Sequence, residues 1–99
     1  MMSAQDGRPL PAVYRQSDQV VSSRLGDGGV LVHLRTNRIF ELNETGIRIW
    51  ELIGQGLTVA EMVAALQSEF EVDESVARAE IGDLLQMLGR EGLVHVDGR

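Results

Sequence analysis

The spacing of apolar residues changes once along this chain, at Asn43, and that change limits the folds open to it. Before Asn43, apolar residues come in short runs separated by glycine-rich and polar turns, which is typical of strands joined by tight connections. After Asn43 they recur every three or four residues, which is typical of amphipathic helices. The pattern therefore predicts an α+β fold with strands first and helices afterwards.

Three short strands are expected between residues 19 and 42. The first begins at Val20, the second covers residues 30–34 and the third covers residues 38–42. Residues 26–29 include three glycines, and we expect a turn there because glycine adopts positive φ at little cost. Asn37 ends the second turn and suits a left-handed backbone. Tight turns between short strands predict a three-stranded antiparallel β-meander.

Helix-start signals predict three α-helices after the meander. Asn43 is a good N-cap for the first helix, and residues 58–61 (Thr-Val-Ala-Glu) form a capping box for the second. Asp73 caps a third helix that is expected to run to about Arg90. Residues 93–96 form a last short extended segment that is expected to cover the core.

The chain has room for one domain. Its 99 residues allow a single small core. Residues 1–17 hold both prolines and many polar residues, so we expect a flexible N-terminal arm there and the domain at residues 18–97. The absence of cysteine excludes disulfides and zinc–thiolate sites. There is no signal-peptide pattern and no apolar run of about 20 residues, so we expect a cytoplasmic protein without membrane contact.

No residue set points to catalysis or to a bound cofactor. The two histidines, His33 and His95, each stand alone without a second metal ligand at suitable spacing. We expect His33 to point toward solvent or an edge, on the opposite side from Val32 and Leu34. No glycine-rich phosphate loop opens a helix, and no nucleophile lies in a recognisable motif. The sequence therefore predicts no catalytic residues, no metal and no cofactor, and disfavours an enzyme.

The charge distribution disfavours nucleic acid as a partner. Residues 1–40 carry five Arg and three acids, whereas residues 41–99 carry four Arg and twelve acids, a net −8. Strands followed by three helices also suit a winged-helix DNA-binding regulator, whose last helix enters the major groove. Here that helix is mainly acidic, which repels phosphates. A structural dimerisation module, with two copies paired through a free strand edge, is a further alternative.

The third strand and third helix are the candidate binding elements. A strand with one side unpaired can accept an extended peptide as an added strand. On the helix, one line beside the core stripe holds four residues at spacings of four, three and four, namely Val76, Glu80, Asp83 and Met87. The candidate peptide-binding residues are Arg38, Ile39, Phe40, Glu41, Leu42, Val76, Glu80, Asp83, Leu84 and Met87. The alternative is that Val76 and Met87 pack on the sheet while the two acids are merely solvated.

The chain resembles one known family over about residues 19–96. The resemblance rests on residues 31–36, on the stretch 40–46 (Phe-Glu-Leu-Asn-Glu-Thr-Gly) and on residues 49–52 (Ile-Trp-Glu-Leu). It continues through Gly56, Thr58, Val59 and Glu61, and through Leu84, Leu85, Leu88 and residues 92–94. The Leu-Asn-x-x-Gly-x-x-Ile-Trp run after a short hairpin is the most specific part. The family that these motifs resemble is the PqqD family.

The resemblance implies a winged-helix-like fold and a non-catalytic role. Such domains are recognition elements for ribosomally made, modified peptides, and they bind the leader of a precursor peptide as a strand added to the third strand, against the third helix. They present the core peptide to an enzyme, either a radical S-adenosylmethionine protein in pyrroloquinoline quinone (PQQ) biosynthesis or a leader peptidase in lasso-peptide pathways. Residues 34–37 (Leu-Arg-Thr-Asn) replace the Tyr-Pro-Glu-Gly turn of the quinone-pathway members, which leans toward another pathway such as lasso peptides.

Overall fold

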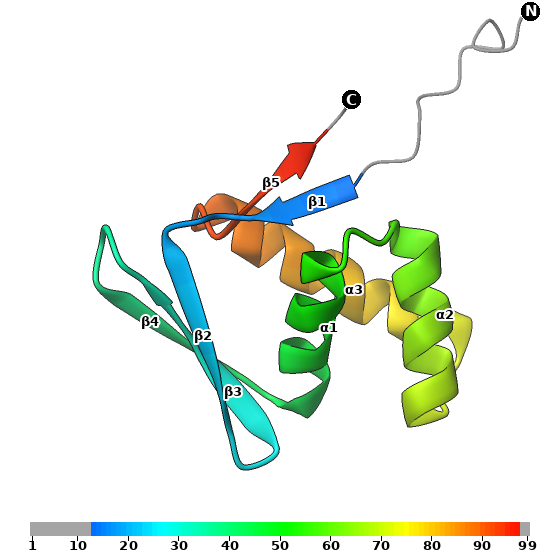
Figure 1. Cartoon of the computed structure of the whole chain (residues 1–99). Coiled ribbons are helices and arrows are strands. Elements are labelled where there is room, and N and C mark those ends of the chain that lie inside the picture. The colour runs from blue at the N-terminus through cyan, green and yellow to red at the C-terminus, as the bar shows by residue number, and fades with distance from the viewer. Residues whose placement is uncertain (1–12, 98–99) are drawn as a thin grey trace, which may run out of the picture.

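The computed structural model describes residues 13–97 and contains the predicted meander followed by three helices (Figure 1). The antiparallel sheet has the order β2-β3-β4. Its strands are β2 (Val20–Leu25), β3 (Gly28–His33) and β4 (Arg38–Leu42). The helices are α1 (Glu44–Gly54), α2 (Val59–Phe70) and α3 (Glu74–Arg90). The predicted α+β class is confirmed, and so is the order of three meander strands followed by three helices.

A second, two-stranded sheet was not predicted. β1 (Val13–Gln16) pairs antiparallel with β5 (Val94–Asp97), with Val13 opposite Asp97. The prediction of an arm without regular structure is therefore wrong for residues 13–16, while residues 1–12 of that arm lie outside the described residues. The strand forms because its backbone groups pair with a segment about 80 residues later, and Gln16 Nε2 donates to the Trp50 carbonyl oxygen at 2.8 Å.

The glycine-rich turn is shorter than predicted, because only its first two residues connect the strands. Gly26 has φ +58°, while Gly28 and Gly29 already belong to β3. These two glycines are required by space instead of by backbone conformation. A Cβ on Gly28 would lie 2.3 Å from the Leu42 carbonyl oxygen, and one on Gly29 would lie 2.7 Å from Ile47 Cδ1. The close approach sets β3 tightly against the end of β4 and the start of α1.

The helix starts follow the predicted capping signals with one exception. The Asn43 side-chain oxygen accepts from the Gly46 N–H at 2.8 Å. At α2 the Thr58 N–H donates to the Glu61 carboxylate, and Thr58 Oγ1 accepts from the Glu61 N–H. Asp73 occupies the N-cap position of α3, but its side chain makes no capping hydrogen bond. The Asn43 cap starts α1 at Glu44, so one residue separates this helix from the end of β4 at Leu42.

The core lies between the sheet and the three helices. It includes the predicted apolar faces of the helices and the inner face of β3 and β4. The fully buried large side chains are Leu31, Ile47, Ile49, Leu52, Ile53, Met62, Leu66, Ile81, Leu88 and Leu93. Phe40 and Leu42 face this core, whereas Ile39 and Glu41 are exposed, as the period-two pattern of the strand predicted. α1 is the central element, since it contacts both other helices and both sheets.

His33 is buried, and the expectation that it reaches solvent or an edge is wrong. Its side chain does lie opposite to Val32 and Leu34, but that side is the inner face of the sheet, shared with Leu31. His33 is 8% exposed, and its Nδ1 accepts from the Arg35 N–H at 3.3 Å. The error has a simple cause: the two valines of β3 suggested that their side of the strand was the buried one.

Candidate functional site

One edge of the three-stranded sheet, β4, has no neighbouring strand among residues 13–97. The direction of its backbone groups follows from its neighbour. The Leu34 N–H donates to the Gln19 carbonyl oxygen at 2.7 Å, so the main-chain groups of Leu34 face the β2 side. Such groups alternate along a strand, so those of His33, Leu31 and Gly29 face β4.

The register then fixes which residues of β4 face the open edge. Arg38, Phe40 and Leu42 lie opposite His33, Leu31 and Gly29, so their N–H and C=O groups point toward β3. The N–H and C=O groups of Ile39 and Glu41 therefore point outward. Ile39 is also 66% exposed at its side chain. Two residues of β4 thus present donors and acceptors that an incoming strand can pair with.

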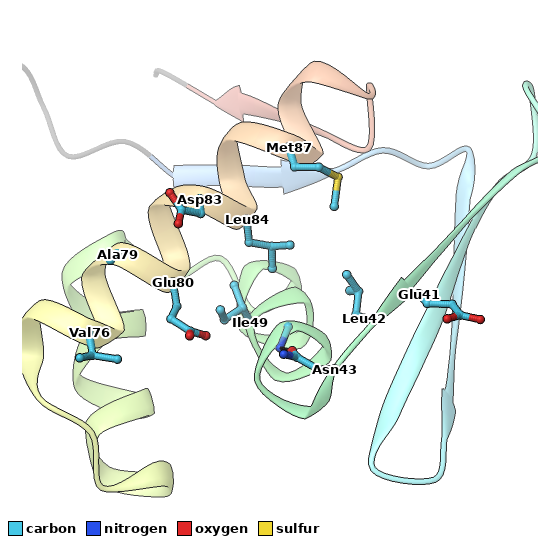
Figure 2. A pocket seen from close by; sticks show the side chains of 11 residues that line it. Glu41, Leu42, Asn43, Ile49, Val76, Ala79, Glu80, Asp83, Leu84 and Met87 are labelled. Atoms are coloured by element: carbon cyan, nitrogen blue, oxygen red, sulfur yellow. Dashed lines mark hydrogen bonds between the residues drawn. The ribbon is translucent and has the colours of Figure 1, made fainter.

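A groove of about 720 Å³ lies beside this edge (Figure 2). It is bordered by the end of β4 and by one line of α3 residues, and the first turns of α1 form its floor. The lining residues are Glu41, Leu42, Asn43, Gly46, Ile49, Val76, Ala79, Glu80, Asp83, Leu84 and Met87. The unpaired edge and the hollow next to it are thus combined in one site.

Seven of the ten predicted site residues line this groove. They are Glu41 and Leu42 from β4 and the five residues named on α3. The other three, Arg38, Ile39 and Phe40, lie outside the groove: Ile39 is on the outer sheet face and Phe40 is half-buried on the inner face. Contact between these ten residues and a peptide stays a prediction.

Four lining residues were not predicted. Asn43, Gly46 and Ile49 come from the start of α1. In the sequence, Asn43 was predicted only as an N-cap, Ile49 only as part of the buried helix face, and Gly46 was noted only within the family motif. Ile49 is 1% exposed, so most of its side chain belongs to the core and only a small part of it forms the floor of the groove. Ala79 lies one turn from Val76 and Asp83, and helical spacing alone identifies it as a neighbour on the same face. The contribution of α1 depends on how sharply the chain turns after β4, which the sequence pattern does not contain.

The groove is acidic on an apolar floor. Glu80 and Asp83 of α3 line it, Glu41 borders it with its side chain directed away from α3 (Figure 2), and no Arg is among its lining residues. None of these three carboxylates has a hydrogen bond or ion pair to another described residue. Five of the seven described arginines instead pair with carboxylates outside the groove. The site therefore has negative charge without a cation from its own walls.

An ion pair ties the start of β4 to the end of α3. Arg38 Nη1 lies 2.5 Å from Glu91 Oε1, and the guanidinium carbon of Arg38 lies 5.2 Å from the centroid of the Phe40 ring. Glu91 is the C-cap of α3. Both sides of the groove are thereby connected at the end where Met87 lies.

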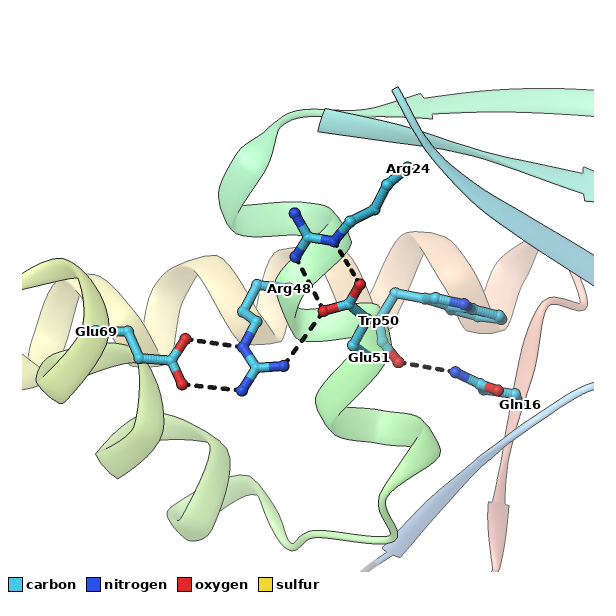
Figure 3. Close-up of polar contacts among 6 residues, drawn as sticks. All are labelled: Gln16, Arg24, Arg48, Trp50, Glu51 and Glu69. Atoms are coloured by element: carbon cyan, nitrogen blue, oxygen red, sulfur yellow. Dashed lines mark hydrogen bonds and ion pairs between the residues drawn. The ribbon is translucent and has the colours of Figure 1, made fainter. Parts of the chain in front are cut away.

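A network of four charged residues holds α1, and so the groove floor, against β2 and α2 (Figure 3). Arg24 from β2 and Arg48 from α1 both bond Glu51, at 2.6 Å and 3.2 Å. Arg48 also binds Glu69 of α2 through two parallel hydrogen bonds of 2.8 and 2.9 Å. Hydrogen bonds from these guanidinium groups hold the pKa of each carboxyl below its usual range. The largest effect comes from Arg24 at Glu51 and from Arg48 at Glu69.

The described residues contain neither a metal-binding cluster nor a membrane-spanning helix. Within residues 13–97, no three His, Cys, Asp or Glu side chains are grouped so that they could hold a metal ion. None of the helices in that range has the length and apolar character needed to cross a membrane.

Comparison with known proteins connects this geometry to one family. The sequence model for coenzyme PQQ synthesis protein D (PqqD) matches residues 28–94. A solved structure of TbiB1 in complex with the TbiA(beta) leader peptide is 35% identical, has a TM-score of 0.74, and aligns over 86% of this chain and 96% of that one. A lasso peptide synthetase B1 complexed with the leader peptide is 25% identical with a TM-score of 0.75, over 84% and 98%. None of the curated proteins compared with the chain matches it.

Proposed function

The chain belongs to the PqqD family, and on that basis we propose that it binds the leader of a ribosomally made precursor peptide and presents it to a modifying enzyme. The observation that carries the proposal is the open edge of β4 beside an unfilled groove. Both similar structures were solved with a leader peptide bound. The leader adds to β4 as a fourth strand and lies between that strand and α3.

Main-chain pairing supplies the general part of the affinity. Ile39 and Glu41 each offer one N–H and one C=O to the leader. Each hydrogen bond that the leader makes there replaces hydrogen bonds to water, so its net contribution to the binding free energy is about 0.5–1.5 kcal/mol. Met87 lies eleven positions after Val76 on α3, a rise of about 16 Å, which equals the length of about five residues of an extended chain. The groove therefore accommodates a leader segment of about that length.

Delivery requires no chemistry on this chain. A leader held on β4 keeps the attached core peptide near an enzyme that is bound to, or visits, the same domain. A short flexible tether gives an effective concentration of about millimolar, far above the level of a free precursor. We propose that the enzyme belongs to a lasso-type pathway and is its leader peptidase, because both similar structures carry leader peptides and one is a lasso peptide synthetase component.

The test is Ile39→Pro with Ile39→Thr as its control. Proline removes the N–H that faces the open edge, and edge strands tolerate proline at such positions. Threonine keeps the N–H and also favours strands. Calorimetric titration with a synthetic leader peptide that binds the original chain should show about a twofold to tenfold weaker Kd for the proline variant, as one lost hydrogen bond implies. Equal affinity of both folded variants would exclude pairing at Ile39.

A second copy of the chain is the other occupant that this edge fits, because two β4 edges related by a twofold axis can pair with each other. Sedimentation with and without leader separates the two. A dimer that dissociates as leader is added agrees with leader binding on β4. A dimer that persists at saturating leader places the pairing of copies elsewhere or favours a structural role.

A further inference from the structure

A second, smaller cavity lies at the Val76 end of the groove. It has a volume of about 60 Å³ and is more enclosed than the groove. Three helices meet around it, and its lining residues are Thr45, Leu66, Phe70, Val72, Val76, Ala77 and Glu80. Val76 and Glu80 line both cavities, so the small cavity opens where the groove ends. We call it the aliphatic recess.

The walls of the aliphatic recess define what it accepts. Five of its seven lining residues are apolar, and Leu66 and Ala77 are completely or almost completely buried. A water needs about 10–15 Å³ of such volume, so the recess of about 60 Å³ has room for about four to six groups of that size. That matches the three or four carbons of a Val, Leu or Ile side chain and is too small for an indole ring.

Charge defines what lies next to it. Glu80 stands between the recess and the groove, and Asp83 follows one turn later on α3. Neither carboxylate has a partner among residues 13–97. A lysine or arginine of a bound peptide would supply the cation that the groove walls lack. The groove is thus complementary to a basic side chain and the recess to an aliphatic one.

The geometry also gives the spacing between the two side chains. From Val76 to Glu80 the helix rises about 6 Å. Side chains two apart on an extended strand point to the same face and lie about 6.6 Å apart. An aliphatic side chain in the recess therefore places the side chain two positions away beside Glu80 and Asp83.

We infer that this chain selects peptides with an aliphatic residue and a basic residue two positions apart, the first held in the aliphatic recess and the second by Glu80 and Asp83. The inference rests on the proposed leader binding and adds to it the chemical class of the leader. It names no particular precursor.

The probe is a library of random dodecapeptides displayed on phage and selected on the full chain. The expected result is enrichment of Val, Leu or Ile two positions from Lys or Arg.

Glu80→Arg should change the basic preference to an acidic one and keep the aliphatic preference. Val76→Phe, which narrows the mouth of the recess from an exposed position, should remove the aliphatic preference and keep the basic one. Glu74→Arg makes the same change in charge on α3 outside the groove and should leave both unchanged.

Fluorescence anisotropy with one enriched peptide gives the second readout. Glu80→Arg should weaken its binding at least tenfold, and replacing the peptide's basic residue by Glu should restore binding to that variant but weaken it to the original chain. A purely structural effect of the substitution would not give this exchange. Enriched peptides without the aliphatic–basic pair, still displaced by the leader, would overturn the inference and leave leader binding intact. A chain that binds neither leader nor any library peptide would overturn both.

Discussion

Among residues 13–97, two non-glycine residues adopt the left-handed backbone conformation, and they do so at different cost. Asn37 has φ 61° in the turn before β4, a conformation that asparagine tolerates well. Glu71 has φ 55° and ψ 47° at the end of α2, where its N–H donates to the Gln67 carbonyl oxygen. Helices commonly end with glycine in this conformation because a Cβ is unfavourable there. Glu71 is therefore a position where the fold carries backbone strain.

Glu71→Gly should stabilise the chain. Removing the left-handed penalty stabilises the folded chain by about 1–2 kcal/mol, while the greater freedom of glycine in the unfolded chain offsets part of this gain. The free energy of unfolding should therefore rise by about 0.5–1 kcal/mol. Urea denaturation measures the change. Gln55→Gly is the matched control, because Gln55 caps α1 with φ −85° and gains nothing from glycine. A Glu71→Gly variant no more stable than Gln55→Gly would show that the strain is not expressed in solution.

Gly28→Ala should destabilise the chain, because the added Cβ would lie 2.3 Å from the Leu42 carbonyl oxygen, which is backbone and not easily moved. Forcing extra volume into such a contact typically costs about 1–3 kcal/mol. Gly82→Ala is the control, since nothing lies within 4 Å of its Cβ position in α3 and alanine favours helix by about 0.5–1 kcal/mol. Chemical denaturation should show opposite signs for the two. A stabilising Gly28→Ala would mean that β3 and β4 are further apart than described.

At the scale of elements, α1 is fixed from both sides by charge. Arg48 reaches Glu51 within the helix and Glu69 on α2, while Arg24 reaches Glu51 from β2. Both carboxyls have lowered pKa values, so their contribution to stability is fully present above the ordinary value of 4.5 and is lost as the pH falls through the lower value of the folded state. About a third of each carboxylate side chain is exposed, so solvent screens the pairs.

Arg48→Gln should therefore flatten the pH dependence of stability. Between pH 6 and pH 3 the free energy of unfolding should fall further for the original chain than for the variant. The difference should be at most about 1 kcal/mol, because exposed ion pairs contribute no more than that. Urea midpoints across that range measure it, with Arg78→Gln as a control because Arg78 pairs only within α3. Parallel curves for Arg48→Gln and the original chain would show that the network adds nothing to folding.

The elements also show where sequence reasoning succeeds and where it fails. Helix starts depend on neighbours three residues apart, so Asn43 and the Thr58–Glu61 box were readable in the sequence. β1 depends on β5 at the other end of the chain, and nothing local at Val13–Gln16 marks it. The α3 side of the groove follows from helical spacing, whereas its floor follows from the packing of α1. The aliphatic recess, formed where three helices meet, has no sequence signal at all.

At the scale of the whole molecule, binding and folding are coupled, because the groove exists only while β4 and α3 are held apart on α1. A ligand that binds only the folded state adds RT ln(1 + [L]/Kd), about 2.7 kcal/mol at a hundredfold excess over Kd. A domain of this size is only modestly stable, so this is a large fraction of its total. Leader binding should therefore raise the melting temperature of the whole chain, including β1 and β5, which do not line the groove.

Hydrogen exchange gives the most local test of where the leader adds. In the free chain the amide of Phe40 points to β3 and should exchange slowly, whereas those of Ile39 and Glu41 point to the open edge and should exchange fast. Saturating leader should slow the exchange of the Ile39 and Glu41 amides far more than that of the Phe40 amide. The first two amides become part of the new pairing with the leader strand, whereas the Phe40 amide is affected only by the general gain in stability. NMR-detected exchange resolves the three amides. If Ile39 and Glu41 are already protected without leader, the edge is occupied in the free protein, and added-strand binding on β4 is ruled out.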